Sequence, residues 1–292
     1  MSSLQTYLID NWEKEIPEVT QVSAMQALEK GQVLYFPHLS FPLEKNEMRY
    51  LNPEILKPKA KNISYDCEKK ELNGTAKPAS EMAILQSMLD RYANYSRNFL
   101  TKLIPHYSPN LVQAKTSFRP IEIKGRKSSY RKDDTRLHVD SFPSNPTKGK
   151  RILRFFTNIH PNGLARIWRV GEPFEEVVKK MAPKVSRPIP GVAYFLKTIG
   201  ITKDYRTEYD HYMLKIHDLM KKDLNYQATV RQEEIAFPAG CSWMVFTDQV
   251  SHAALSGQHV LEQTFHLPLQ ALHDEAKNPI RMLEKHLNRS LL

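Results

Sequence analysis

Apolar residues recur at two different spacings along the chain, and the spacing changes near Pro105. From Ala79 to Leu103 they return every third or fourth residue, which predicts a helix with one face in the core. Residues 23–41 predict a short helix that ends near Gly31, followed by a strand. Residues 1–109 are therefore expected to form a helical and strand support for the rest of the fold.

After Pro105, apolar residues come in short runs that are separated by Pro, Gly and Asn. Eight such runs predict strands: residues 112–123, 135–140, 150–159, 164–170, 227–237, 241–247, 250–255 and 259–268. Many short strands of this kind favour a β-sandwich or barrel over a βαβ sheet. We therefore expect an α+β protein with a mostly β core, whose barrel covers about residues 110–270.

Two helical patterns, residues 173–181 and 204–224, interrupt the strands and predict an insertion over about residues 172–225. A C-terminal helix is expected within about residues 272–292, so that the whole chain, residues 1–292, forms one domain. Its apolar stripe comprises Ile280, Leu283, Leu287 and Leu291, with basic residues beside it. This stripe either packs against the body or a second subunit, or lies on an anionic membrane surface.

Composition and charge narrow the class of protein. Hydrophobic residues make up 41% and charged residues 25% of the chain, as in an ordinary globular protein. The chain has no long apolar run and no signal-peptide pattern, so we expect a cytoplasmic protein. Two cysteines, Cys67 and Cys241, are too few for a zinc cluster, which leaves histidines and carboxylates as candidate metal ligands.

The net charge of +10 favours an anionic partner. Basic residues concentrate at residues 57–62 and 124–132. Each run is either a solvated loop or a surface that meets a negatively charged substrate.

Three residues have the types and spacing of a ferrous site, which needs two imidazoles and one carboxylate on one side of the ion. His138 and Asp140 are two positions apart in an expected strand, so their side chains point the same way. A His-x-Asp pair alone also arises by chance. His252 stands at the start of a later strand beside small residues, and is either the third ligand or a core histidine with a hydrogen-bond partner.

Two stretches, "LHVDSFPSNP" and "PAGCSWMVFTDQVSHAALSGQHVLEQTF", resemble the iron(II)/2-oxoglutarate-dependent dioxygenase superfamily. With "SFRPIEIKGRKSSYRKDDTRLHVDSFPS" and "RILRFFTNIHPNGLARIWRVGEPFE", the chain is most similar to the bacterial hydroxylases of 3-deoxy-D-manno-oct-2-ulosonic acid (Kdo). The resemblance implies a double-stranded β-helix, a jelly-roll or cupin-like barrel, flanked by helices. It also implies hydroxylation at C3 of Kdo in the lipopolysaccharide inner core (Kdo-lipid A), giving Ko, with succinate and CO2 as co-products.

The same resemblance implies that His138, Asp140 and His252 hold the iron and form the catalytic centre. The implied cofactors are Fe(II), the cosubstrate 2-oxoglutarate and O2, with ascorbate as a candidate stimulant. The chain departs from the common pattern in one respect. Many members bind 2-oxoglutarate with an arginine or lysine shortly after the second histidine, whereas this chain has Gln263 and His266 there.

Another cation must therefore bind the cosubstrate, and the fork of an arginine suits a carboxylate better than a lysine does. Strand alternation puts Arg154 on one face with Phe156 and Asn158, and Arg166 on one face with Trp168. We expect Arg154 and Arg166 to bind anions, with Asn158 and Gln263 as supporting hydrogen-bond groups for 2-oxoglutarate. Alternatively, either arginine pairs with a core carboxylate.

Substrate binding is expected from Arg119, Trp168 and Arg131. The guanidinium of Arg119 would bind the sugar carboxylate and the indole of Trp168 would lie against a sugar face, although Arg119 alone is equally consistent with a surface position. The basic loop around Arg131 would attract lipid A phosphates.

Two other functions compete with this interpretation. One is a dioxygenase with a different anionic substrate, a nucleic acid or a small acid, although the chain has no recognisable nucleic-acid module and we expect no nucleic-acid partner. The other is a cupin-like protein that binds a ligand without catalysis. An anionic glycolipid substrate would place the protein at the inner face of the bacterial inner membrane. The sequence leaves the oligomeric state open, as well as the choice between free and lipid-linked Kdo.

Overall fold

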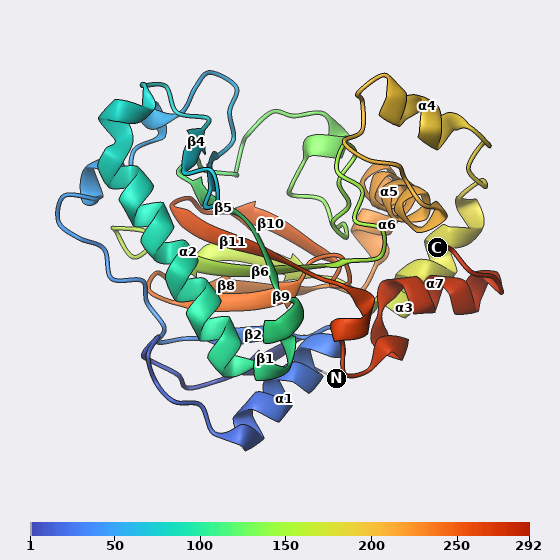
Figure 1. Ribbon diagram of the computed structural model, residues 1–292, viewed down its shortest axis with the longest axis horizontal. Coiled ribbons are helices and arrows are strands. Elements are labelled where there is room, and N and C mark those ends of the chain that lie inside the picture. Colours follow the sequence, from blue (N-terminus) through green and yellow to red (C-terminus); the bar gives the residue numbers. More distant parts are fainter. Residues whose placement is uncertain (1) are drawn as a thin grey trace.

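The computed structural model describes residues 2–292, which form two facing β-sheets surrounded by helices (Figure 1). The larger sheet has the strand order β1-β2-β9-β6-β11-β5-β3-β4, and the smaller one has the order β10-β7-β8. Aromatic side chains join the two sheets: Trp168 of the smaller sheet packs edge-on against Phe156 and Trp243 of the larger, with ring centroids 5.1 and 5.6 Å apart. The expected α+β jelly-roll class is confirmed.

The strands are β1 (Leu4–Thr6), β2 (Val33–Phe36), β3 (Ile63–Asp66), β4 (Glu71–Asn73), β5 (Val112–Arg119), β6 (Arg151–Asn158), β7 (Arg166–Val170), β8 (Glu233–Phe237), β9 (Ser242–Phe246), β10 (His252–Ser256) and β11 (Val260–Leu267). Seven of the eight strands predicted after Pro105 are present, as β5 to β11. β1 and β2 pair in parallel, and the strands that line the site pair antiparallel.

The prediction of a strand over residues 135–140 was wrong, because this segment makes only a single bridge, between His138 and His252. Its main chain bonds instead to several separate parts of the fold. Leu137 N donates to the side-chain oxygen of Gln227 at 2.8 Å, and Asp140 N donates to Thr247 O at 2.7 Å. Because several separate hydrogen bonds hold this segment, it can position the side chains of His138 and Asp140 although it is not a strand of either sheet.

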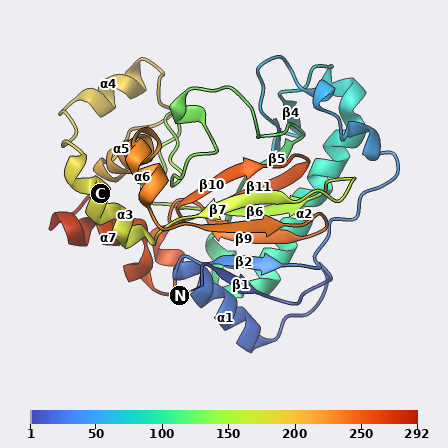
Figure 2. The same ribbon diagram turned by 180° about the vertical axis from the view of Figure 1, so that it is seen from behind.

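The helices are α1 (Glu18–Glu29), α2 (Ala83–Leu103), α3 (Phe174–Met181), α4 (Val192–Thr198), α5 (Glu208–Lys222), α6 (Leu224–Thr229) and α7 (Pro279–Leu287). Short 3-10 turns occupy residues 48–50, 53–55, 79–82, 105–110, 130–132, 182–184, 269–271 and 275–277. α2 has the predicted buried stripe and covers the outer face of the larger sheet (Figure 2). There Phe99 stacks on Phe155 at 5.6 Å, and Tyr92 donates a hydrogen bond to Phe155 O.

α3 to α6 follow β7 and precede β8 in the chain. α3, α5, α6 and α7 enclose a second apolar core, to which α4 contributes no buried residue. α7 ends at Asn288, whose left-handed backbone (φ 53°) stops the helix before residue 292. Ile280 and Leu283 of its stripe are fully buried, and α7 packs against α3. The stripe therefore packs against the body, and a membrane surface has no access to it. The assignment of the whole chain to one domain stays a prediction.

Among residues 2–292, none of the helices combines the length and the apolar character needed to cross a membrane.

Candidate active site

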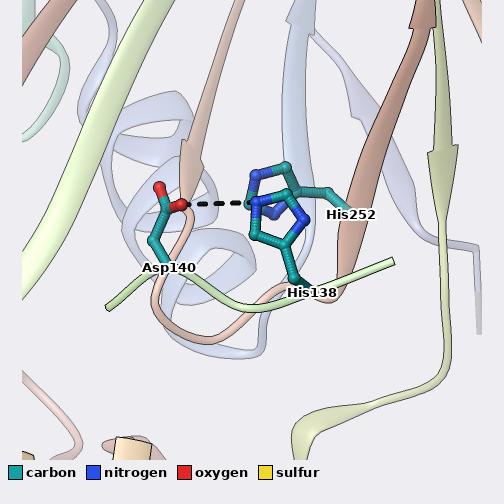
Figure 3. A group of neighbouring side chains, drawn as sticks. All are labelled: His138, Asp140 and His252. Carbon is teal, nitrogen blue, oxygen red and sulfur yellow. Dashed lines mark ion pairs between the residues drawn. The ribbon is translucent and has the colours of Figure 1, made fainter. Parts of the chain in front are cut away.

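Three side chains meet between the two sheets: His138 and Asp140 from the segment before β6, and His252 from the first residue of β10 (Figure 3). Each offers one ligand atom, and these atoms lie within 4.8 Å of one another. The main chains of His138 and His252 exchange two hydrogen bonds, of 3.0 and 2.9 Å. This double bridge fixes the two imidazoles side by side, with ring centroids 4.7 Å apart.

Both imidazoles are held in one tautomer by carbonyl groups. Nδ1 of His138 lies 2.8 Å from Arg136 O, and Nδ1 of His252 lies 2.8 Å from Val250 O. A carbonyl oxygen only accepts, so each Nδ1 carries the proton and each Nε2 keeps its lone pair. Metal-binding histidines are commonly oriented in this way by their second nitrogen.

Burial sets the charge of the three groups. It lowers the pKa of His138 to about 3 and also lowers the pKa of His252, so both imidazoles are neutral at neutral pH. Burial alone would raise the pKa of Asp140, but the guanidinium of Arg154 holds it well below its ordinary value. Two neutral imidazoles and one carboxylate form a donor set that fits a ferrous ion.

Three arginines line the same cavity, together with a buried carboxylate, Glu262. Arg119 donates from Nε and Nη2 to one oxygen of Glu262, at 2.8 and 2.5 Å. Arg154 bridges the other oxygen of Glu262, at 3.0 Å, and Asp140, at 2.9 Å. Glu262 therefore orients two guanidinium groups toward the triad, and the two arginines lower the pKa of Glu262 although burial alone would raise it.

The third arginine, Arg166, lies on β7. Its Nη1 donates to Gly257 O at 2.6 Å, whereas its Nε is buried without a hydrogen-bond partner, as is Nε of Arg154. Burial, and then the positive charge of Arg119, lower the pKa of Arg166 to about 9. A Cβ at Gly257 would lie 2.9 Å from Cα of Arg166, so only glycine allows the β10–β11 turn to approach this closely.

A second group of charges surrounds Asp134, which also lines the cavity. Arg126 contacts its carboxylate at 2.5 Å and Lys61 at 3.4 Å. The buried Lys221 donates to Arg131 O at 3.1 Å, and burial lowers its pKa. Lys61, Arg126 and Lys221 therefore bring three further positive charges close to Asp134 and Asp140.

Comparison with known proteins identifies the family of this chain. Residues 11–290 match the family model described as 3-deoxy-D-manno-oct-2-ulosonic acid (Kdo) hydroxylase. The chain belongs to the Kdo hydroxylase family. A search of curated proteins gave no match.

Solved structures of a Kdo hydroxylase, KdoO, described as a non-heme Fe(II) α-ketoglutarate-dependent dioxygenase, are similar over nearly the whole chain. The cobalt(II) complex is 48% identical with a TM-score of 0.97, covering 99% of this chain and 97% of that one. The complex with α-ketoglutarate and Fe(III) is 47% identical with a TM-score of 0.96, at the same coverage of 99% and 97%. The complex with succinate and Fe(III) is 47% identical with a TM-score of 0.95, again covering 99% and 97%.

Most of the expected site residues lie together in this Kdo hydroxylase. The cavity lining includes the triad, Arg119, Arg154, Arg166 and Trp168. Trp168 stacks on the ring of His252, with centroids 5.1 Å apart, so one face of its indole supports a proposed metal ligand.

Three expected residues lie elsewhere. The amide nitrogen of Asn158 donates to Leu164 O and Phe237 O, at 2.9 and 3.0 Å, and closes the end of β6. Gln263 accepts from Thr116 at 2.6 Å and donates to Ala114 O at 3.0 Å, on the face of β11 opposite Glu262. Arg131 is 62% exposed and pairs with Asp218. The hydrogen-bonding groups of both amides are already satisfied by the fold, so neither joins the cofactor site that we propose.

Sequence reasoning missed Glu262, Asp134 and Lys221, whereas Lys61 lies in the basic run of residues 57–62 noted in the sequence. A signal for Glu262 was present: it is a lone acid in the apolar run of β11, and its register partner there is Phe156, which shares the cavity face with Arg154. Asp134, Lys61 and Lys221 come from loops and helices whose approach to the site depends on the tertiary fold.

Proposed function

We propose that this Kdo hydroxylase binds Fe(II) through His138, Asp140 and His252 and hydroxylates C3 of a Kdo residue in the lipopolysaccharide inner core, giving Ko. The cosubstrate is 2-oxoglutarate, and the co-products are succinate and CO2. The observation that supports this most directly is the convergence of two Nε2 lone pairs and one carboxylate beside three arginines. Bound Fe(II), with O2 and 2-oxoglutarate, supplies the oxidising chemistry, while the protein positions the reactants.

Side chains of the protein must position the carboxylates of two molecules, the cosubstrate and the Kdo residue. The cosubstrate is a dicarboxylate and Kdo is a sugar acid, so the site must bind several negative charges close to the metal. Buried guanidinium groups suit this task, and Nε of Arg154 and of Arg166 are donors without protein partners. We propose that Arg119, Arg154 and Arg166 share these carboxylates between them, with Glu262 holding Arg119 and Arg154 in place.

We further propose that the Kdo residue is linked to lipid A and that the enzyme works at the inner face of the inner membrane. The charges around Asp134 support a polyanionic substrate, because Lys61, Arg126 and Lys221 bring three positive charges and Asp134 only one negative charge. The net charge of +10 would attract the same kind of substrate from a distance.

The decisive test is mass spectrometry of the lipopolysaccharide core from a Ko-free bacterium that expresses this protein. We expect one Kdo residue to gain one oxygen atom. The same strain expressing His252→Ala should show unmodified Kdo. An unmodified core with the folded, iron-loaded wild-type protein would contradict the proposed substrate.

A further inference from the structure

One surface segment, residues 186–206, is apolar and exposed. It contains α4 and joins the two parts of the helical insertion, α3 and α5. Of the fifteen large apolar side chains that are exposed within residues 2–292, seven lie here: Ile189, Val192, Tyr194, Phe195, Ile199, Ile201 and Tyr205. None of the seven belongs to an apolar core of the molecule or packs against one. Exposed apolar side chains gathered this densely mark an interaction surface.

The segment is anchored beside the active site. Lys203 N donates to Ser144 O at 2.9 Å, and the guanidinium of Arg206 donates to Pro143 O. Pro143 and Ser144 belong to the loop that directly follows the proposed metal ligand Asp140. Figures 1 and 2 both show α4 at the outer margin of the molecule, on the same side as this loop. A membrane or protein surface that contacts α4 would therefore lie close to the loop that follows Asp140.

Basic residues accompany the apolar ones. Residues 186–206 contain four basic residues, Arg187, Lys197, Lys203 and Arg206, and one acid, Asp204. Asp204 pairs with Lys197 at 3.1 Å and also with Lys148 from outside the segment. A short helix with Tyr, Phe and Ile beside Lys and Arg has the composition of an element that lies in the boundary of an anionic bilayer.

We propose that residues 186–206, which we call the α4 segment, dock on the surface of an anionic phospholipid bilayer and hold the active site close to lipid-linked Kdo. This inference rests on the proposed lipid-linked substrate. The charge of the segment favours a bilayer over a second copy of the chain, because a two-fold contact would bring two net-positive segments together. Anionic headgroups neutralise this charge, while the exposed aromatic and branched side chains enter the interface.

The test is co-sedimentation with phosphatidylglycerol vesicles and, separately, with phosphatidylcholine vesicles. The test variant combines Tyr194→Ser, Phe195→Ser, Ile199→Ser and Ile201→Ser. A matched control removes four exposed apolar side chains from other parts of the surface: Leu8→Ser, Val19→Ser, Leu164→Ser and Leu224→Ser. We expect the test variant to lose about tenfold or more in its partition to phosphatidylglycerol vesicles. The control should bind like wild type, and phosphatidylcholine should bind all three proteins weakly.

A second measurement separates this inference from the proposed function. Hydroxylation of a deacylated, soluble Kdo substrate needs no bilayer, so wild type and the test variant should turn it over equally, whereas turnover of vesicle-borne substrate should fall in the variant. Unchanged vesicle binding in the test variant would overturn the docking proposal, even with full activity. A wild-type dimer in sedimentation velocity that the test variant loses would assign the α4 segment to a second copy and would also overturn it. Vesicle binding without hydroxylation of any Kdo substrate would instead count against the proposed function.

Discussion

At the scale of single residues, the site combines neutral imidazoles with an ionised carboxylate and buried guanidinium groups. Each ligand side chain is oriented by a neighbour: a carbonyl on Nδ1 of each histidine, and Arg154 on Asp140. Glu262 plays the same part for Arg119 and Arg154. Orientation of this kind reduces the rearrangement that a bound ion and an anionic ligand would require.

Removing a proposed iron ligand should abolish turnover and leave the fold intact. We expect this of His138→Ala, Asp140→Ala and His252→Ala, because two remaining ligands cannot hold the ion with the required geometry. Consumption of 2-oxoglutarate and bound iron should both disappear, while the melting temperature without metal stays within a few degrees. His286→Ala, on the exposed face of α7, is the matched control. Full activity in any of the three variants would remove that residue from the proposed site.

The roles of the three cavity arginines can be separated by conservative replacement. Arg119→Lys, Arg154→Lys and Arg166→Lys each keep the charge but lose the planar fork that binds a carboxylate with two hydrogen bonds. The KM for 2-oxoglutarate or for the Kdo substrate should rise roughly 10- to 100-fold in each variant. The affected KM shows which carboxylate that arginine binds. If none of the three variants changed either KM, the anion-binding proposal would fail.

The buried His259 gives the protein a specific sensitivity to acid. Burial, and the nearby His160, lower the pKa of His259 from 6.5 to about 4. Between these values the unfolded chain binds a proton that the native protein does not, so stability is lost as the pH falls through this window. His259→Asn should reduce the slope of unfolding free energy against pH by up to about 1.4 kcal/mol per pH unit.

Asparagine suits that position because the backbone of His259 is left-handed (φ 55°). Urea unfolding between about pH 7 and pH 4 measures the slope. The exposed His286→Asn serves as control and should follow wild type. Equal slopes in wild type and His259→Asn would show that His259 takes up its proton in the native state.

Residue types and strand alternation indicated much of this site, but not which polar side chains remain available to bind a ligand. Alternation grouped Arg154 with Phe156, and Arg166 with Trp168, and these side chains line the cavity. Asn158 is expected on the same face of the strand as Arg154, yet its side-chain amide donates hydrogen bonds to the carbonyls of Leu164 and Phe237. Hydrogen bonds to a distant main chain depend on the final packing, so the sequence pattern could not reveal them.

At the scale of elements, the amphipathic pattern predicted helices well but not what their apolar faces contact. The stripe on α7 was consistent with either protein or membrane, and it is buried against the body. The segment that is actually apolar and exposed contains α4, a short helix that periodicity did not predict. Seven residues make barely two turns, too few for a reliable 3.6-residue pattern.

Burial of the α7 stripe leads to a stability prediction. Leu283 is fully buried, so Leu283→Ala should lower the free energy of unfolding by about 2–5 kcal/mol. Chemical denaturation measures this loss, and Lys285→Ala on the exposed side of the same helix is the control. Vesicle binding of the folded Leu283→Ala protein should equal that of wild type. A stability loss below about 0.5 kcal/mol would mean that α7 contributes little to the core.

At the scale of the whole molecule, the two sheets bring together residues that are far apart in the sequence. Arg119, Arg154 and Glu262 come from the larger sheet, whereas Arg166 and His252 come from the smaller one. The fold class and seven of eight strands after Pro105 followed from alternation and turn residues. β1, β3 and β4 have only three or four residues each, and hydrogen bonds to neighbouring strands stabilise them. The alternation of apolar and polar residues over so few positions could not predict these strands.

The excess of positive charge should control capture of the substrate more than its conversion. The molecule carries a net charge of +10, and Lys61, Arg126 and Lys221 add local positive charge beside the triad. Raising the ionic strength from about 0.05 to 0.5 M shortens the screening length to a few ångströms, which weakens attraction at long range but hardly affects buried contacts. The KM for lipid-linked Kdo, with its phosphates, should therefore rise steeply with salt while kcat stays nearly constant. Free Kdo, which has one carboxylate and no phosphate, should show a smaller rise in KM, since fewer charges are screened. Equal salt dependence for the two substrates would show that the basic surface does not recognise the lipid phosphates.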